Sequence, residues 1–218
     1  MSASQRPADA RTRLRRARLI GLSLAGALAA VLGVVLVWPL YAKRNQPLPV
    51  LGEMPAFELV DHRGELARAT DFEGRALVAN FVFTRCPTIC PVFSMKMQRL
   101  QERTSRLGPD LQLVSFSVDP EHDTPEVLAD YASRYEADPE RWTFLTGELD
   151  EMRRTVRDGL HIAMQPGGEL PDGGPDIIHS THFVLFDAEL RIRGYYDSNI
   201  PERLDDLVRD ARRLARGR

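Results

Sequence analysis

The chain has 218 residues, 43% of them hydrophobic, which is enough for one ordinary globular domain with an appendage but too little for two full-sized domains. Its two cysteines exclude a disulfide-rich scaffold and a metal site with four cysteine ligands. The net charge of −2 is unevenly distributed. Residues 1–44 carry eight basic side chains and one acidic side chain, whereas the remainder carries 21 basic and 30 acidic side chains. This acidic remainder argues against nucleic-acid binding.

Residues 19–38 are an uncharged run of 20 residues that predicts a transmembrane helix. At about 1.5 Å per residue, a helix of this length spans roughly 30 Å, the thickness of a bilayer core. Five arginines lie just before it, in residues 11–18, so the positive-inside rule places the basic segment 1–18 in the cytoplasm and the C-terminal part across the membrane. A cleaved signal peptide is the alternative, but its apolar core is only about 7–15 residues long. We therefore predict an uncleaved anchor.

The remaining chain predicts a linker over residues 39–55 and one domain over residues 56–218. Its strand and helix patterns alternate, which is typical of an α/β fold. The strand patterns occur at 57–60, 66–69, 77–84, 111–118, 142–145, 183–186 and 191–196. The helical patterns begin at Pro91 and at Pro125, the latter running to about residue 137, and continue at 149–160 and 201–214.

Both cysteines lie where the strand pattern at 77–84 gives way to the next helix, in the sequence Cys86-Pro87-Thr88-Ile89-Cys90. Loop amides and a helix N-terminus at such a junction stabilise thiolates. A disulfide that closed so short a loop would stabilise the fold little. We therefore interpret the C-x-x-x-C pair as functional rather than structural. The pair can close to a disulfide, which would leave no thiolate to bind a metal.

Three segments together resemble the Sco, or SenC, family of copper chaperones, whose fold is thioredoxin-like and which serve the assembly of cytochrome c oxidase. They are the cysteine segment 81–91, the segment 118–125 (VDPEHDTP), and the segment 178–181 (IHST) with Gly194-Tyr195-Tyr196. The resemblance covers about residues 48–215. It implies a thioredoxin-like domain that binds one copper ion, Cu(I) or Cu(II), through Cys86, Cys90 and His179. Thiolates suit Cu(I), and imidazole suits both oxidation states.

The resemblance also implies the function and its partners. The protein would receive copper from a donor protein and deliver it to the copper-bearing subunit of cytochrome c oxidase. It would also be able to reduce cysteines of its target. It would not be an enzyme in the ordinary sense. With the anchor, it implies a single-pass protein of the bacterial inner membrane with its C-terminal domain in the periplasm, rather than one of the mitochondrial inner membrane. The family pattern places an acidic residue at Asp119, which either supports the cleft or caps the turn at Pro120.

Two other functions compete with copper delivery. A thioredoxin-type thiol–disulfide oxidoreductase would carry C-x-x-C, and it would have a proline where this chain has Thr181. A peroxiredoxin-like redox sensor would have a threonine three residues before its reactive cysteine, where this chain has Phe83. These two differences from the thioredoxin and peroxiredoxin patterns favour a metal site over either redox function.

The other histidines and the nearby methionines are weaker candidates for ligands. His122 follows a buried strand and is a candidate for an accessory role, whereas we interpret His62 as solvated in a turn. The remaining side chains are interpreted as core, surface or structural: His161, His182, Met95 and Met97.

Overall fold

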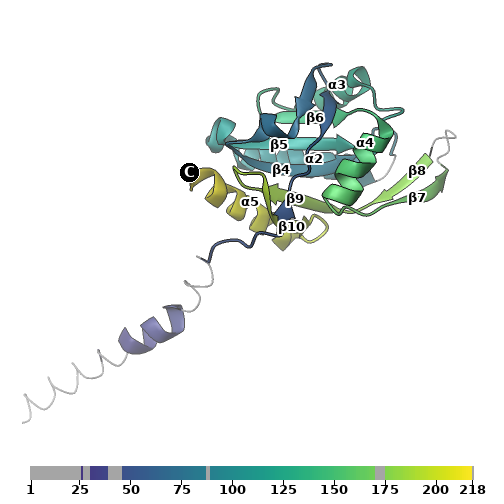
Figure 1. Cartoon of the computed structure of the whole chain (residues 1–218). Coiled ribbons are helices and arrows are strands. Elements are labelled where there is room, and N and C mark those ends of the chain that lie inside the picture. The colour runs from purple at the N-terminus through teal and green to yellow at the C-terminus, as the bar shows by residue number, and fades with distance from the viewer. Residues whose placement is uncertain (1–25, 27–29, 39–45, 87–88, 170–174, 218) are drawn as a thin grey trace, which may run out of the picture. The chain divides into compact units, whose positions relative to one another are not determined.

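The computed structural model describes residues 26, 30–38, 46–86, 89–169 and 175–217 (Figure 1). The chain divides into two compact units, Met1–Pro47 and Leu48–Arg218. In the first unit, residues 30–38 form an exposed helix. No helix among the described residues is long and apolar enough to cross a membrane. The predicted basic segment 1–18, and residues 19–25 and 27–29 of the predicted anchor, lie outside the described residues.

The second unit is built on an eight-stranded sheet with the order β1-β10-β9-β4-β5-β6-β2-β3, and β7 pairs with β8 in a separate two-stranded sheet. The pairs β4–β5 and β5–β6 are parallel, and the other neighbours are antiparallel. The strands are Gly52–Glu53 (β1), Glu58–Asp61 (β2), Leu66–Arg68 (β3), Ala76–Val82 (β4), Leu111–Ser117 (β5), Trp142–Thr146 (β6), Met164–Glu169 (β7), Pro175–His179 (β8), His182–Phe186 (β9) and Arg191–Asp197 (β10).

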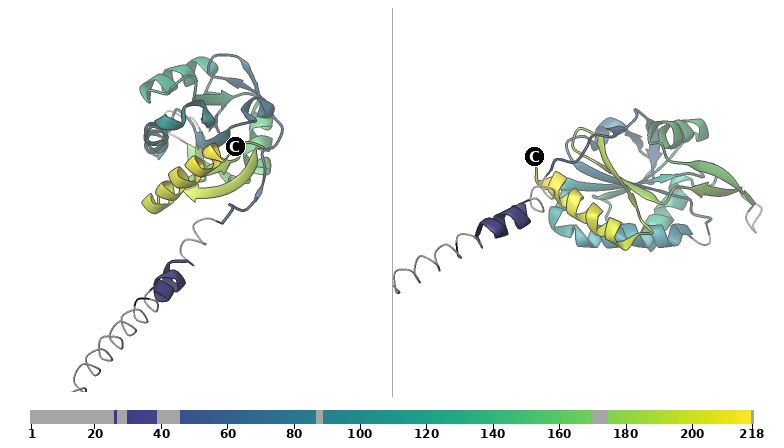
Figure 2. Two further views of the ribbon diagram at one scale, coloured as in Figure 1. Left: turned by 90° about the vertical axis from the view of Figure 1, so that its left-hand side faces the viewer. Right: turned by 90° about the horizontal axis from the view of Figure 1, so that it is seen from below.

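Helices cover both faces of the large sheet (Figure 2). The helical elements are η1 (Ala69–Phe72), α2 (Ile89–Arg103), η2 (Ser105–Asp110), α3 (Pro125–Arg134), α4 (Leu149–Arg153), the π-helical η3 (Arg154–Gly159) and α5 (Pro201–Arg216). On one face of the sheet, buried side chains of α2, α3 and α5 form a cluster with every second strand residue. On the other face, buried side chains of α4 and η3 form a second cluster with the strand residues in between. This is the predicted α/β architecture.

The sequences of the central strands β4 and β5 are almost continuously apolar because both faces of these strands are buried. Every residue of both strands is buried, because each strand has helices or other packed elements on both faces. Leu77 and Phe81 of β4 join the cluster with α4, whereas Val78 joins the cluster with α2, as the two-residue period of a strand requires.

Several predicted boundaries differ from the structure. Helix α2 begins at Ile89, two residues before Pro91, so Cys90 lies in its first turn. Proline is tolerated there because the first N–H groups of a helix have no partner within the helix. Thr124 caps α3, which ends at Arg134, three residues before the predicted end at about residue 137. The helix predicted at 149–160 is an α-helical turn followed by the π-helical η3.

The sequence patterns did not predict β1 or the β7–β8 hairpin. The segment 39–55, expected as a linker, contributes β1, in which Gly52 pairs with Ile192 of β10. The compact unit therefore begins at Leu48, before the expected start at residue 56. The β7–β8 hairpin was missed because its residues Pro166, Gly168 and Pro175 are unfavourable in strands, and its register shifts between Pro166 and Gly168.

Candidate metal centre

The two cysteines flank the loop between β4, the central strand, and α2. Cys86 lies in a turn in which its N–H donates to the carbonyl of Phe83 at 3.3 Å. Cys90 lies in the first turn of α2, and its N–H donates to Sγ of Cys86 at 3.5 Å. The two cysteines are not joined by a disulfide. The fold therefore brings the two sulfur-bearing side chains together at the carboxyl end of β4.

The two thiols differ in their surroundings. Cys86 keeps 7% of its surface exposed, whereas Cys90 is completely buried. Burial raises the pKa of the Cys90 thiol, and a hydrogen bond from the backbone of Phe83 opposes this only in part; the neighbouring Cys86 raises it further. The Cys90 N–H also donates to Cys86 Sγ. Cys86 is thus the accessible sulfur, and Cys90 loses its proton only to a strong competitor such as a soft metal ion.

A buried carboxyl group fixes the chain just before Cys86. Asp123 accepts hydrogen bonds from the backbone N–H of Thr84 at 3.2 Å, from Thr84 Oγ1 at 2.6 Å and from Ser117 Oγ at 2.6 Å. Because Thr84 follows β4 and Ser117 ends β5, these bonds connect the two loops at this edge of the sheet. The local sequence pattern does not reveal this partnership, because Thr84 and Asp123 are 39 residues apart in the chain.

An ion pair lies beside the cysteine loop. Arg85 donates from Nε and Nη2 to one carboxylate oxygen of Asp119, at 3.0 and 2.7 Å. Asp119 is buried, and its own N–H donates to Ser117 Oγ at 3.1 Å. Asp119 therefore supports the cleft by holding the residue that precedes Cys86. Sequence reasoning missed Arg85, although it stands inside the cysteine motif.

His179 is the last residue of β8, and it pairs with Met164 of β7. Its imidazole lies outside the described part of the structure. The hairpin packs on the folded core through its apolar residues Met164 and Ile177, which lie against the buried cluster to which both cysteines belong. Among the described side chains, no three His, Cys, Asp or Glu residues are grouped so that they could hold a metal ion. The assignment of Cys86, Cys90 and His179 as ligands stays a prediction.

The other histidines make contacts of their own. The Nδ1 atom of the half-buried His182 lies 2.7 Å from Ser180 Oγ. His122 and His161 are exposed. His62 is half-buried, unlike the expected solvated residue: its ring packs edge-on against Phe144, and its Nδ1 accepts the Phe144 N–H at 3.3 Å. The burial lowers the pKa of His62.

The two methionines of α2 behave as their helical positions predict. Met97 is completely buried in the cluster beneath α2, and Met95 is 44% exposed on the opposite side. Neither is placed with the cysteines by any described contact.

A hollow of about 940 Å³ opens beside the ion pair, lined by Val118 and Asp119 of the loop after β5, by α4 and η3, and by Met164 and Ile177 of the hairpin. Its rim carries charges of both signs, including Asp150 and Arg157. The candidate centre therefore adjoins a space that a partner segment could enter.

The fold and the cysteine junction define a thioredoxin-like protein with a pair of thiols at the start of a helix. The family described as SCO1/SenC matches residues 48–216, and the chain belongs to this family. The thioredoxin-like fold expected from the sequence is thereby confirmed for the folded unit.

Solved structures that resemble the chain include three proteins of the Sco family. A SCO1/SenC family lipoprotein from Bacillus anthracis str. Ames is 32% identical with a TM-score of 0.67, over 77% of this chain and 97% of that one. BsSco, described with a disulfide switch and as a member of the Sco family of cytochrome c oxidase assembly proteins, is 28% identical with a TM-score of 0.65, over 78% and 97%. Yeast Sco1 with copper bound is 26% identical with a TM-score of 0.62, over 74% and 89%.

The difference in burial predicts different reactivities of the two thiols. In the reduced protein at neutral pH, iodoacetamide should modify Cys86 at least about tenfold faster than Cys90, because Cys90 is fully buried and its pKa is raised. Mass spectrometry of timed samples measures both rates, and the urea-unfolded protein, in which the rates should converge, is the control. Equal rates in the folded protein would contradict the description of the two thiols.

The buried carboxyl group predicts a pH-dependent stability difference. Burial raises the pKa of Asp123 above its ordinary value, although bonds from Ser117 and Thr84 act in the opposite direction. The native state then binds this proton more tightly than the unfolded state does, so the contribution of Asp123 to stability falls as pH rises from about 3.9 through the raised pKa. Urea unfolding should show the wild type losing stability relative to Asp123→Asn between pH 4 and pH 7. A difference in unfolding free energy between the two proteins that stays constant with pH, or changes in the opposite direction, would contradict the raised pKa of Asp123.

Proposed function

We propose that the chain is a membrane-anchored protein that binds copper and delivers it to the copper-bearing subunit of cytochrome c oxidase during assembly. The observation that carries this proposal is the contact between the Cys90 N–H and Cys86 Sγ, which brings two thiols together at the start of α2. Two sulfur donors at one place are the ligands that a soft ion such as Cu(I) prefers.

The proposed ligands are Cys86, Cys90 and His179. The residues fit copper, because thiolates bind Cu(I) strongly and an imidazole accommodates either oxidation state. Binding requires both sulfurs as thiolates, so loading displaces the proton that burial holds on Cys90. The small exposed part of Cys86 offers a route by which the ion can enter and leave. A three-ligand site also leaves copper transferable, whereas zinc normally takes four ligands.

The relatives support this assignment at the level of the family. Yeast Sco1 was solved with copper bound, and BsSco is described as belonging to a family of cytochrome c oxidase assembly proteins. The anchor rests on the uncharged run at 19–38 and the arginines that precede it. It places the folded unit on the periplasmic side of a bacterial inner membrane, where a copper donor protein and the oxidase subunit would meet it.

A second activity is supported by the same pair of thiols. Cys86 and Cys90 can close to a disulfide while a disulfide on the target protein is reduced to two thiols, with two electrons and two protons passing to the target. The disulfide switch described for BsSco supports this reaction for the family. It would prepare cysteines of the oxidase subunit for copper, so it complements delivery rather than replacing it.

The central prediction is that copper loading depends on the redox state of the cysteines. The reduced full-length chain should bind about one Cu(I), and the oxidised chain should bind little, because a disulfide offers no thiolate. Cys86→Ser or Cys90→Ser should abolish tight binding, since a hydroxyl is a hard donor. His179→Ala should weaken Cu(I) less, because two thiolates remain, but should remove Cu(II) retention. Copper per chain and thiol count are measured on the same samples.

The matched control is His182→Ala, which removes a histidine three residues from His179 and should leave copper binding unchanged. Equal copper in reduced and oxidised chains would show that the cysteines are not the ligands. Loss of Cu(II) retention in the His182 variant alone would show that the proposal names the wrong histidine.

A further inference from the structure

The Arg85–Asp119 ion pair places two opposite charges beside the candidate metal centre. Arg85 immediately precedes Cys86, and consecutive Cα atoms lie about 3.8 Å apart. Asp119 reaches the same loop from the segment after β5, where its Oδ2 atom accepts both guanidinium hydrogen bonds. Only 19% of the Arg85 side chain and 3% of the Asp119 side chain are exposed. Solvent and salt therefore screen these two charges much less than they screen charges on the surface.

The Asp119 carboxylate is held through one of its two oxygen atoms. Both bonds from Arg85 end at Oδ2, and no described residue donates a hydrogen bond to Oδ1. Asp119 also lines the hollow that adjoins the centre. Among the described residues, the Arg85 guanidinium is the cation that pairs with this carboxylate. Loss of the guanidinium would therefore leave a buried negative charge without compensation.

The other charges around the hollow are placed differently. The charged side chains of α4 and η3 that line it are at least half exposed, and solvent screens them: Asp150, Arg153, Arg154, Arg157 and Asp158. Asp123, the other buried carboxyl group at this edge, is hydrogen-bonded to hydroxyl groups rather than to a cation. The Arg85–Asp119 pair is therefore the place where a single substitution changes the buried charge next to the cysteine loop.

Such a change would act unequally on the two oxidation states of copper. With two thiolates and a neutral imidazole, the proposed centre carries one negative charge when it holds Cu(I) and no net charge when it holds Cu(II). A further negative charge nearby repels the Cu(I) form and so favours Cu(II), whereas a positive charge nearby favours Cu(I). The balance between Arg85 and Asp119 is therefore expected to set the preference of the centre for one oxidation state.

We propose that Arg85 determines which oxidation state of copper the centre prefers, because it cancels the buried charge of Asp119 and so favours Cu(I). This inference rests on the proposed function, since it concerns copper held at Cys86, Cys90 and His179. Arg85 is not itself a ligand, because a guanidinium stays protonated in proteins and has no acceptor atom. It acts through its charge and through the carboxylate that it holds.

The test compares the full-length wild type with Arg85→Gln, Asp119→Asn and the double variant R85Q/D119N, at about pH 8, where an unpaired carboxyl group is ionised. Competition with bathocuproine disulfonate gives the Cu(I) affinity, and competition with nitrilotriacetate gives the Cu(II) affinity. The ratio of Cu(II) affinity to Cu(I) affinity should rise about tenfold in Arg85→Gln and fall about tenfold in Asp119→Asn. Each tenfold change corresponds to about 59 mV in the reduction potential of bound copper. The double variant removes both charges and should return close to the wild-type ratio.

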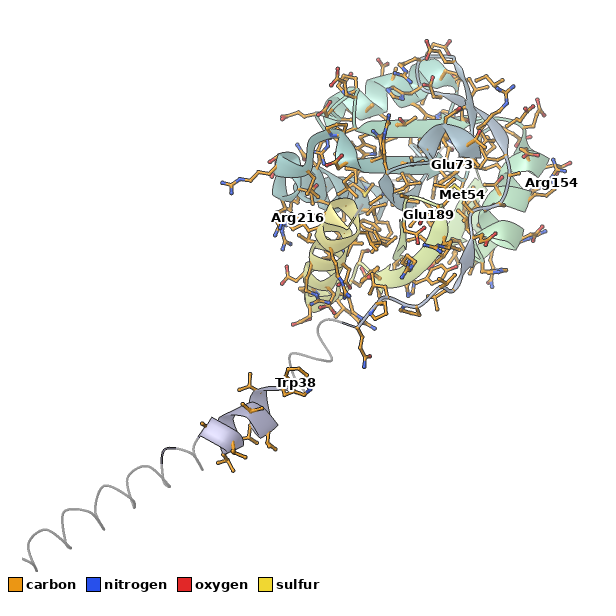
Figure 3. All side chains as sticks on the ribbon, turned by 60° about the vertical axis from the view of Figure 1, so that its left-hand side comes forward. Trp38, Met54, Glu73, Arg154, Glu189 and Arg216 are labelled. Atoms are coloured by element: carbon orange, nitrogen blue, oxygen red, sulfur yellow. The ribbon has the colours of Figure 1, made fainter. Side chains whose placement is uncertain are left out.

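Two further variants are the controls. Arg85→Lys keeps the positive charge and should keep the wild-type ratio. Arg193→Gln breaks an ion pair of similar burial, in which Arg193 and Asp187 are 2.6 Å apart with 11% and 6% of their side chains exposed. This pair belongs to the opposite edge of the sheet, because Phe186, the residue before Asp187, pairs with Leu77 near the start of β4. Figure 3 shows Glu189, in the same turn as Asp187, well apart from Arg154, which lines the hollow. Arg193→Gln should leave the ratio unchanged.

The opposite signs of the two single substitutions separate an electrostatic role from a merely structural one, because damage to the loop would change the ratio in the same direction in both variants. Changes of the same sign, an unchanged ratio in both variants, or an equal change in Arg193→Gln would overturn this inference and leave copper binding intact. A reduced wild-type chain that binds neither copper ion would instead overturn the proposed function, and this inference with it.

Discussion

The buried carboxyl group of Asp123 is the contact on which the shape of the candidate metal centre depends. It joins the loop after β4 to the end of β5 through Thr84 and Ser117. A buried carboxyl group is costly unless its hydrogen-bonding capacity is used, so these bonds restrict the loop to one arrangement. That arrangement places Cys86 where the first turn of α2 directs the Cys90 N–H at its sulfur. The Arg85–Asp119 ion pair is a second contact between the same loop and the segment after β5.

The folded unit collects different features at the two edges of its parallel strands. The carboxyl ends of β4 and β5 carry the cysteines, the buried carboxyl groups and the adjoining hollow. The opposite edge carries η2 and the ends of α2 and α5, where the Arg212 guanidinium donates to the carbonyl of Arg103. A helix that follows a parallel strand runs back to the edge of the sheet where the strands begin. The candidate metal centre therefore lies at the carboxyl ends of the strands, and the C-termini of the helices lie at the opposite edge.

The sequence predicted the features that depend on local patterns. The fully buried strands β4 and β5, the β9–β10 hairpin and the helix after the cysteines all follow from periodicity. The β7–β8 hairpin did not follow, because Pro166 and Gly168 conceal its strand pattern. The partners of Asp123 and Asp119 were also beyond prediction, since hydrogen bonds between loops far apart in the chain leave no local pattern. The cysteine pair was found because its spacing is local.

The most direct test of the metal centre is X-ray absorption at the copper edge of the full-length chain loaded with Cu(I) under reducing conditions. We expect two sulfur ligands and one nitrogen ligand for the wild type. The nitrogen contribution should disappear in His179→Ala, whereas Cys90→Ser should retain too little copper to give the spectrum of a specific site. A spectrum with fewer than two sulfur ligands in the wild type would contradict the account, because the proposed centre uses the sulfur atoms of both Cys86 and Cys90.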